Sequence, residues 1–347
     1  MTIFKKSNVF NLDIDSLQES LIEIGEPSYR AKQIWNGLYL NLFSSWDEFS
    51  SLPKPLRNKL ENLFSIYSIT PKKTLLASDG NSQKILFHLH DEKPIESVLM
   101  RSGRRQTLCL STQSGCAMGC SFCATGKMGL LRNLNSGEII EQVLFFTRQL
   151  INISQQLTNI VFMGMGEPFH NYKDVVNAIN ILNNQDGLHF GSRRITISTI
   201  GLIPQIGRIA EDLPQVNLAV SLHAPNDELR SKLVPINRRY PLVDLINACR
   251  NYIKKTNRRI SFEYVLIKNT NDDPSLADEL GQLVKGMLCH INLIPYNTIN
   301  KSEYEPPQIQ KTKSFEKILL NKGIPTTIRK SQGREIKAAC GQLSGQI

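Results

Sequence analysis

Three cysteines stand close together in the run Cys116-Ala-Met-Gly-Cys120-Ser-Phe-Cys123, a C-x3-C-x2-C spacing. Thiolates are soft ligands, and a short glycine-containing loop lets three of them surround one soft metal centre. Structural zinc sites usually take two C-x2-C pairs or one pair and two histidines, and no second pair follows here. An iron–sulfur cubane normally takes four cysteines, so three leave one iron open to a substrate. A zinc loop completed by a distant His or Cys stays as the alternative.

The segments that must position this loop predict repeated βα units. From Thr107 onward, apolar and β-branched runs alternate with stretches of helical periodicity. The six runs are LCLST, NIVFM, RITIST, NLAVSLH, RISFEYVLI and HINLIPY. This alternation predicts an α/β fold with a parallel sheet, either closed as a partial barrel or open and doubly wound. In both arrangements the chemistry gathers at the C-terminal ends of the strands.

The rest of the chain divides around this core. Apolar spacing and a helix restart after two prolines predict helices in the first 70 residues, and two short β-like runs follow. The predicted domains are a helical accessory domain at 1–70, a β-rich connector at 71–106, a core at 107–300 and a basic C-terminal segment at 301–347.

Polar residues and glycines recur where the predicted core strands end. They are Gly166 and Glu167 in GMGE, Ser198 after RITI, Ser221, Leu222 and His223 in SLH, and Asn297 after the sixth strand. Glycines allow close approach of a ligand to the backbone, and a carboxylate can accept from an ammonium group. Singly, such residues would be caps or turn groups. Their recurrence at strand ends predicts a shared ligand pocket.

The seven cysteines are an odd number, which excludes a complete disulfide framework. The chain shows no secretory signal and no apolar run long enough to span a membrane, so we expect no membrane association and a reducing cytoplasmic location. In that compartment cysteines are more often metal ligands or catalytic residues than members of structural disulfides. Cys249 and Cys289 match no motif and are expected to be buried free thiols.

The net charge of +10 is unevenly distributed. Residues 1–70 hold seven basic and eight acidic residues, whereas residues 311–337 hold eight basic and two acidic ones. Such an excess favours a polyanionic partner, since Lys and Arg that neutralise phosphates gain affinity by releasing counterions. Simple solubility is the alternative explanation.

Taken together, the motifs identify a family resemblance that covers nearly the whole chain. The stretches LCLSTQSGCAMGCSFCATG, FMGMGEP, RRITISTIG, VSLHAPND, LVPIN, NLIPYN and AACGQL resemble, in this order, the RlmN and Cfr family of radical S-adenosylmethionine (SAM) RNA methyltransferases. The resemblance implies a partial (β/α)6 barrel and one [4Fe-4S] cluster held by Cys116, Cys120 and Cys123, with SAM on the open iron. It also assigns the strand-end residues Gly166, Glu167, Ser198, Ser221, Leu222, His223 and Asn297 to SAM.

The same resemblance implies a catalytic set made of Cys340, Cys109 and Glu96. In the family's scheme Cys340 accepts a methyl group from a first SAM, and a radical from a second SAM activates that methyl group. The carbon radical adds to the adenine, Glu96 accepts a proton, and Cys109 attacks the Cys340 sulfur to leave a disulfide. From the residues alone, Cys109 and Cys340 would be buried thiols and Glu96 an ordinary strand carboxylate.

The family implies 23S rRNA and the tRNA anticodon loop as partners, and a flavodoxin-type protein as electron donor. Pro168 in GMGEP favours methylation at adenine C2 over the Cfr-type reaction at C8, since the Cfr pattern has Ala there. Two other functions stay open at this point: a non-catalytic zinc-containing RNA-binding protein, and a radical SAM enzyme acting on a small molecule.

Overall fold

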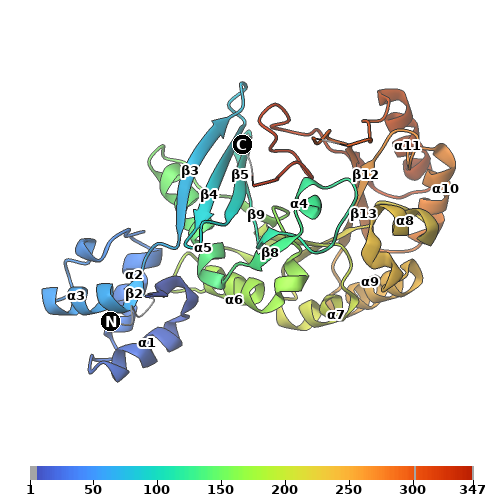
Figure 1. Ribbon diagram of the computed structural model, residues 1–347. Coiled ribbons are helices and arrows are strands. Elements are labelled where there is room, and N and C mark those ends of the chain that lie inside the picture. Colours follow the sequence, from blue (N-terminus) through green and yellow to red (C-terminus); the bar gives the residue numbers. More distant parts are fainter. Residues whose placement is uncertain (1–5, 301, 346–347) are drawn as a thin grey trace.

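The computed structural model describes residues 6–300 and 302–345, so the outer ends of the predicted first and last domains, 1–5 and 346–347, and residue 301 lie outside it. One ten-stranded sheet runs through the molecule in the order β14-β13-β12-β11-β10-β9-β6-β5-β4-β3. Its β3 to β6 part is antiparallel and the remainder is parallel. In Figure 1 the N-terminal helices lie at one end of this sheet and the last βα units at the other.

The parallel part contains all six predicted core strands. They are β6 (Arg105–Cys109), β9 (Asn159–Phe162), β10 (Ile195–Thr199), β11 (Asn217–Ser221), β12 (Ile260–Leu266) and β13 (Cys289–Pro295). The predicted α/β fold class is therefore confirmed. A seventh parallel strand, β14 (Thr326–Ile328), pairs with β13 and was not predicted, because three residues are too few to show a strand period.

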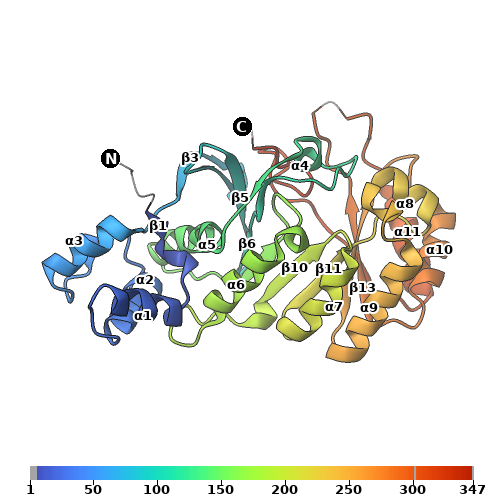
Figure 2. The same cartoon turned by 60° about the horizontal axis from the view of Figure 1, so that its bottom comes forward.

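Helices follow the core strands and cover the outer face of the sheet. They are α5 (Ser136–Ile151), α6 (Tyr172–Asn183), α7 (Ile203–Asp212), α8 (Asp227–Leu233), α9 (Leu242–Thr256), α10 (Pro274–Leu283) and α11 (Ile309–Asn321). Figure 2 shows α5, α6, α7 and α9 on this face. A capping box begins α5, in which Asn135 and Glu138 accept each other's backbone N–H groups.

Strand alternation gives the sheet two different faces. In β10 the buried Ile195 and Ile197 alternate with Thr196 and Ser198, which line interior cavities. Most parallel barrels fill their interior with branched aliphatic side chains. Here the inward positions of the later strands are largely polar, so the interior stays hollow. They are Asn217, Ser221, Ser261, Glu263, His290 and Asn292.

The strands predicted for residues 71–106 continue the same sheet. They are β3 (Ile69–Leu76), β4 (Ser82–Leu89) and β5 (Pro94–Ser102). One face of this antiparallel part packs on α5, where the Phe87 and Phe145 rings lie 5.1 Å apart between centroids. The other face lies under the C-terminal strap, the name used here for residues 329–345. The strap crosses toward β5 in Figure 1.

The N-terminal part is helical, as the sequence predicts. It contains α1 (Ile14–Glu23), α2 (Arg30–Tyr39), α3 (Lys54–Leu63) and the short parallel pair β1 (Ser7–Asn8) and β2 (Phe64–Ser65). Buried Glu141 of α5 joins it to the core by accepting from Asn8 Nδ2 at 2.6 Å and from the Ser68 amide at 2.9 Å. Across the described ranges, every helix is too short or too polar to cross a bilayer.

Candidate active site

A cavity lies at the C-terminal ends of the parallel strands. Its walls come from the three-cysteine loop, the ends of β9 to β13 and the C-terminal strap. Ten of the thirteen predicted site residues line it, namely Cys116, Cys120, Cys123, Gly166, Glu167, Ser198, Ser221, His223, Asn297 and Cys340. Leu222, Cys109 and Glu96 do not. Cys249 and Cys289 are buried away from this cavity, as expected of structural thiols.

A small hairpin closes the base of the cysteine loop. Strands β7 (Gln113–Gly115) and β8 (Leu130–Asn133) pair on either side of the loop and its short helix α4 (Ala124–Lys127). Gly115 has a φ of +74°, and a Cβ there would meet the Gly129 carbonyl oxygen at 1.9 Å. The Cys116 amide donates to that oxygen at 2.9 Å. Glycine is thus required where the chain enters the loop.

All three thiols line the same cavity, and two of them, Cys116 and Cys120, are buried. Burial raises the pKa of the Cys116 thiol to about 12, and raises that of Cys120, to which Cys123 and Cys116 add repulsion. A bound cation would reverse this by stabilising thiolates. No three His, Cys, Asp or Glu side chains of the described chain are grouped as ligands of a single ion. Three cysteine thiols that face one cavity fit a [4Fe-4S] cluster, in which each thiolate would bind a different iron.

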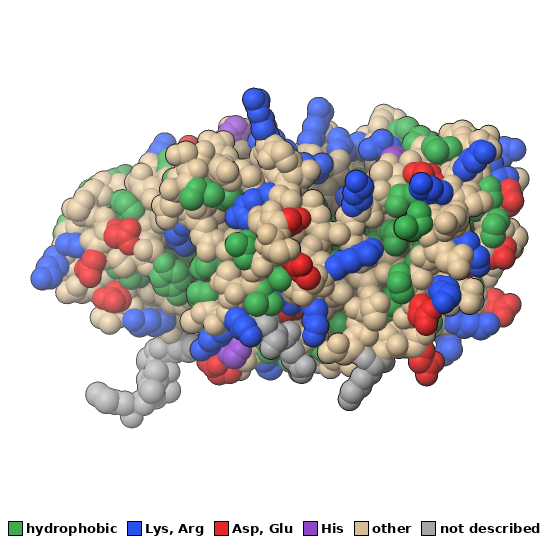
Figure 3. Space-filling model, turned by 90° about the horizontal axis from the view of Figure 1, so that it is seen from above, with side chains coloured by type: hydrophobic (Ala, Val, Ile, Leu, Met, Phe, Trp, Pro, Cys, Tyr) green, Lys and Arg blue, Asp and Glu red, His purple; other side chains and the backbone are tan. Residues whose placement is uncertain are grey.

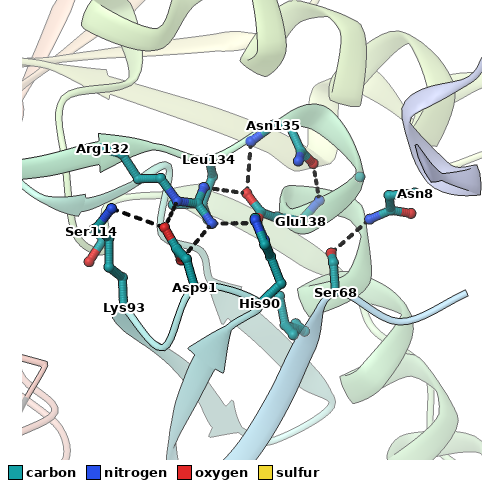
Figure 4. A network of polar contacts seen from close by, with 12 residues as sticks. Asn8, Ser68, His90, Asp91, Lys93, Ser114, Arg132, Leu134, Asn135 and Glu138 are labelled. Carbon is teal, nitrogen blue, oxygen red and sulfur yellow. Dashed lines mark hydrogen bonds and ion pairs between the residues drawn. The ribbon is translucent and has the colours of Figure 1, made fainter. Parts of the chain in front are cut away.

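The hairpin is anchored by Arg132 of β8 (Figure 4). Arg132 Nε lies 2.8 Å from Asp91 in the β4–β5 turn, and its Nη2 lies 2.7 Å from Glu138 at the start of α5. The Arg132 guanidinium and Lys93 hold the pKa of Asp91 well below its usual range. Glu138 is fully buried, so Arg132 compensates a charge that water cannot reach.

An Arg132→Met variant is expected to lose about 3–5 kcal/mol of unfolding free energy, because it removes the guanidinium from the buried Glu138 carboxylate and leaves the His90 ring, 3.4 Å away, beside it. Urea denaturation measures this loss, and iron bound per chain after reconstitution should fall with it. Lys93→Met is the matched control, since Lys93 pairs with Asp91 from a more exposed position. Equal unfolding curves for the Arg132 and Lys93 variants would contradict the anchoring role.

The GMGEP turn brings backbone and a carboxylate to the cavity. Gly166 has a φ of +101°, and a Cβ there would lie 2.5 Å from Gln113 Cβ. Glu167 accepts from Thr199 Oγ1 at 2.8 Å, from the Ile200 amide at 2.9 Å and from the Phe169 amide at 3.0 Å. Burial nevertheless raises the pKa of Glu167 to about 7. A cationic ligand group in the cavity would favour the ionised form of Glu167 and could pair with it.

His223 contributes a neutral ring to the opposite wall. Its Nδ1 accepts from the Val265 amide at 3.1 Å, and burial lowers the pKa of His223 to about 3. Nδ1 being an acceptor, Nε2 carries the proton and is a donor. The neighbouring Leu222 side chain lies in the core, and its amide and carbonyl are bonded to Glu263 and Arg230.

Arg230 connects the strand ends that line the cavity, and the sequence did not predict this role. Its side chain is fully buried and donates to carbonyl oxygens of Ile200 at 2.7 Å, Ser221 at 3.2 Å and Leu222 at 3.0 Å. It thereby joins the ends of β10 and β11. Its place in DELRSKL, between two motif stretches, was the only available signal.

The strap brings Cys340 to the cavity. Asn297 Nδ2 donates to the Cys340 carbonyl at 3.2 Å, and the Ala124 amide of α4 donates to the Gly341 carbonyl at 2.8 Å. Residue 340 is exposed as a whole, but its thiol faces the cavity, where burial raises the pKa of Cys340 and Arg329 opposes the rise; Cys109 is buried in β6. Cys109 belongs to a small apolar cluster with the strap residues Ala338 and Leu343.

Both Cys109 and Cys340 are free thiols in the structure. Burial raises the pKa of Cys109, and proximity to Cys340 raises it further. The structure thus brings Cys109 next to the strap, although it does not line the cavity. Glu96 lies deeper, in an ion pair with Lys84.

The fold and the three-cysteine cavity define a class of enzyme. Residues 110–280 match the model of the radical SAM superfamily, and residues 7–66 match that of the ribosomal RNA large subunit methyltransferase N-terminal domain. A radical SAM methyltransferase from Sphaerobacter thermophilus has a crystal structure that superposes with a TM-score of 0.96. It is 48% identical, covering 98% of this chain and 100% of that one.

Curated relatives narrow the class. A protein of Dictyoglomus thermophilum named "Probable dual-specificity RNA methyltransferase RlmN" is 46% identical, over 97% of this chain and 96% of its own. The Bacillus cereus protein of the same name is 45% identical, over 98% and 93%. This chain belongs to the RlmN family of radical SAM RNA methyltransferases, enzymes that use a [4Fe-4S] cluster and SAM.

Proposed function

We propose that this enzyme methylates C2 of adenosine in 23S rRNA and in the tRNA anticodon loop, with Cys340 as the carrier of the methyl group. The observation that carries the proposal is the position of Cys340. Cys340 lines the cavity formed by the three-cysteine loop and Glu167, and apolar residues of its strap pack on Cys109. The strap thus places Cys340 at the cavity and packs on Cys109, the second thiol that the proposed reaction needs.

The chemistry of the target explains why a carrier is needed. Adenine C2 is an electron-poor ring carbon without a lone pair, so it cannot displace a methyl group from a sulfonium. Cys340 as thiolate can perform that displacement on a first SAM molecule. A cluster held by Cys116, Cys120 and Cys123, when it binds a second SAM and receives an electron, supplies a 5′-deoxyadenosyl radical.

The chain's own residues perform the remaining steps. Methylated Cys340 gives up a hydrogen atom to the 5′-deoxyadenosyl radical, and its methylene carbon bonds to adenine C2. The unpaired electron of this adduct leaves to the one-electron acceptor that the oxidised cluster would provide. Glu96 accepts the C2 proton. The Cys109 thiolate then attacks the Cys340 sulfur, so that an S–S bond forms as the carbon–sulfur bond breaks. The electron pair of the broken bond stays on the methylene carbon, which takes up a proton to become the methyl group. Reduction of this disulfide prepares both thiols for the next turnover.

Gly166, Glu167, Ser198, Ser221, His223 and Asn297 are proposed to bind SAM, with Glu167 on its ammonium group. Leu222 is included only through the backbone turn it forms between Ser221 and His223, since its side chain lies in the core. A flavodoxin-type electron donor and a cytoplasmic location complete the proposal.

The C8 reaction of Cfr-type enzymes is the second candidate, because it would use the same cysteines. Pro168, which begins the short helical turn after Glu167, favours C2. Mass spectrometry of digested rRNA and tRNA, from cells with and without the gene, distinguishes the two. We expect 2-methyladenosine to disappear from both RNA pools in its absence. Loss of 8-methyladenosine instead would reject C2 specificity.

Basic charge on the C-terminal segment supports an RNA partner. Figure 3 shows Lys and Arg side chains along the whole face seen from above, including its middle, where acidic side chains are fewer. Some of the predicted basic residues are already engaged: Arg334 donates to Asn297 at 2.8 Å, and Lys322 pairs with Asp278 at 2.8 Å. Within the described ranges Lys313, Lys317 and Lys330 have no acidic partner.

Replacing Lys313, Lys317 and Lys330 together with Gln is expected to weaken RNA binding without changing SAM affinity. If these residues contact phosphates, the slope of log K against log salt should shrink by roughly 0.7–0.9 per residue. Filter binding over a salt series measures this slope. Lys232→Gln, on α8 and paired with Glu228, is the control. An unchanged slope would assign these charges to solubility.

A further inference from the structure

Two oppositely charged side chains lie buried together under the C-terminal strap. Lys84 of β4 and Glu96 of β5 are 1% and 0% exposed, and Lys84 Nζ lies 2.8 Å from Glu96 Oε1. Their strands pair with Leu86 opposite Glu96 and Lys84 opposite Val98, which places both on the strap-facing side of the sheet. Apolar residues of similar size usually stabilise a fold as well as a buried ion pair does. Stability alone therefore does not explain why a charged pair, and not two apolar residues, lies at this position.

Each member of the pair holds one side of the loop that contains Cys340. Lys84 Nζ donates to the Lys337 carbonyl at 3.2 Å, three residues before the cysteine. Glu96 Oε2 accepts from the Ser344 amide at 2.9 Å and from the Gly345 amide at 3.3 Å, four and five residues after it. The loop from 337 to 345 is thus hydrogen-bonded at both ends to the same ion pair, to Lys84 at its start and to Glu96 at its end.

The two carboxylate oxygens of Glu96 have different partners. Oε1 faces Lys84, and Oε2 is covered by the strap. Glu96 is fully buried and does not line the cavity, so it cannot reach a substrate while the strap is docked. Release of the Ser344 and Gly345 amides would uncover Oε2, and Lys84 would keep the carboxylate in place.

We propose that Lys84 is a positioning residue for the reaction: it docks the Cys340 loop and holds Glu96 through Oε1, so that undocking of the strap frees Oε2 as the proton acceptor. This inference rests on the proposed function and adds a residue to it. In the step concerned, the C2–H bond breaks, its electron pair stays with the ring, and the proton bonds to Oε2. No electron is exchanged with Lys84 or Glu96.

Lys84→Met tests the inference, because it keeps the length of the side chain and removes the charge. The free energy of unfolding should fall, but we expect iron content and SAM binding of the folded variant to stay at the level of the unmodified enzyme, because neither Lys84 nor Glu96 lines the cavity. Turnover should fall roughly 100-fold, the lower end of what a correctly positioned proton acceptor contributes. Trypsin should cut the strap, residues 329–345, roughly tenfold faster, since its fastening at Lys337 is gone. Lys84→Arg should restore slow cleavage and most of the turnover.

The controls separate positioning from folding. Lys73→Met changes an exposed lysine of the neighbouring strand β3 and should leave every readout unchanged. If Lys84→Met lost iron and SAM binding together with turnover, Lys84 would be merely structural and the inference overturned. If the variant folds poorly, Ser344→Pro, which deletes one amide donor to Oε2, should still accelerate strap cleavage. Unchanged cleavage in that variant would also overturn it.

Failure of this inference differs from failure of the proposed function. Should Lys84→Met turn over at the normal rate while the unmodified enzyme makes 2-methyladenosine, only the role of Lys84 is rejected. Should the unmodified enzyme make no 2-methyladenosine, the proposed function itself fails, whatever the Lys84 variants do.

Discussion

A Cys109→Ala variant is expected to stop after one turnover with RNA covalently bound to Cys340. Its methylene carbon can still bond to the adenine, but no thiolate remains to break the carbon–sulfur bond. The result should be a protein band shifted by the mass of the RNA on a denaturing gel, lost on nuclease treatment. Cys249→Ala, which removes another buried thiol away from the cavity, should behave like the unmodified enzyme.

Cys340→Ala is the companion experiment. It should abolish both RNA methylation and the adduct, while iron content and SAM binding persist, because the cysteine loop and the Glu167 wall are intact. Combining it with Cys109→Ala should abolish the adduct seen in the single variant. An active Cys340→Ala enzyme would reject the methyl-carrier role.

Glu167→Gln has the second-largest expected effect, on SAM affinity. A hydrogen bond to a charged group contributes roughly 1.5–3 kcal/mol, so losing the carboxylate should weaken binding about 10- to 150-fold. Equilibrium binding of SAM to the reconstituted protein measures this change. Glu228→Gln, an exposed carboxylate of α8, is the control and should bind normally.

The pH dependence of SAM binding should identify the same group. The pKa of Glu167 is raised by burial to about 7, so the carboxylate is ionised above that pH and neutral below it. Affinity for the SAM ammonium group should therefore fall as the pH drops through about 7, and the Gln variant should lack this transition. A pH-independent affinity of the unmodified enzyme would separate Glu167 from the ammonium group.

Local patterns in the sequence predicted the fold and most of the cavity. Cys116, Cys120 and Cys123 are close in the chain, and Ser198 and Ser221 end strands whose period was clear. Strand ends of a parallel sheet meet at one edge, so these residues had to converge. The short β14 was missed because three residues show no period.

Long-range packing was beyond the reach of these patterns. Glu96 was expected at the reacting atoms, but its burial with Lys84 depends on strand register and on a strap some 240 residues further along the chain. The role of Arg230 depends on carbonyl groups from two strand ends that have no sequence signature. Glu96 accepts from backbone amides of the strap, and Arg230 donates to backbone carbonyls of two strand ends. The positions of such backbone groups are determined only by the folded chain.

The position of strand β14 affects how often the Cys340 thiol meets SAM and the RNA base. Pairing of β14 with β13 fixes the position of the chain at Ile328, and Cys340 follows twelve residues later. A flexible tether of that length spans about 20 Å on average and at most about 40 Å. Once undocked, the thiol would therefore search a small volume around the cavity, at an effective concentration in the range of about 1 mM. If Cys340 is the methyl carrier proposed above, pickup and delivery of the methyl group are encounters within one enzyme–SAM–RNA complex once SAM and RNA are bound, and the tether rather than diffusion sets their frequency.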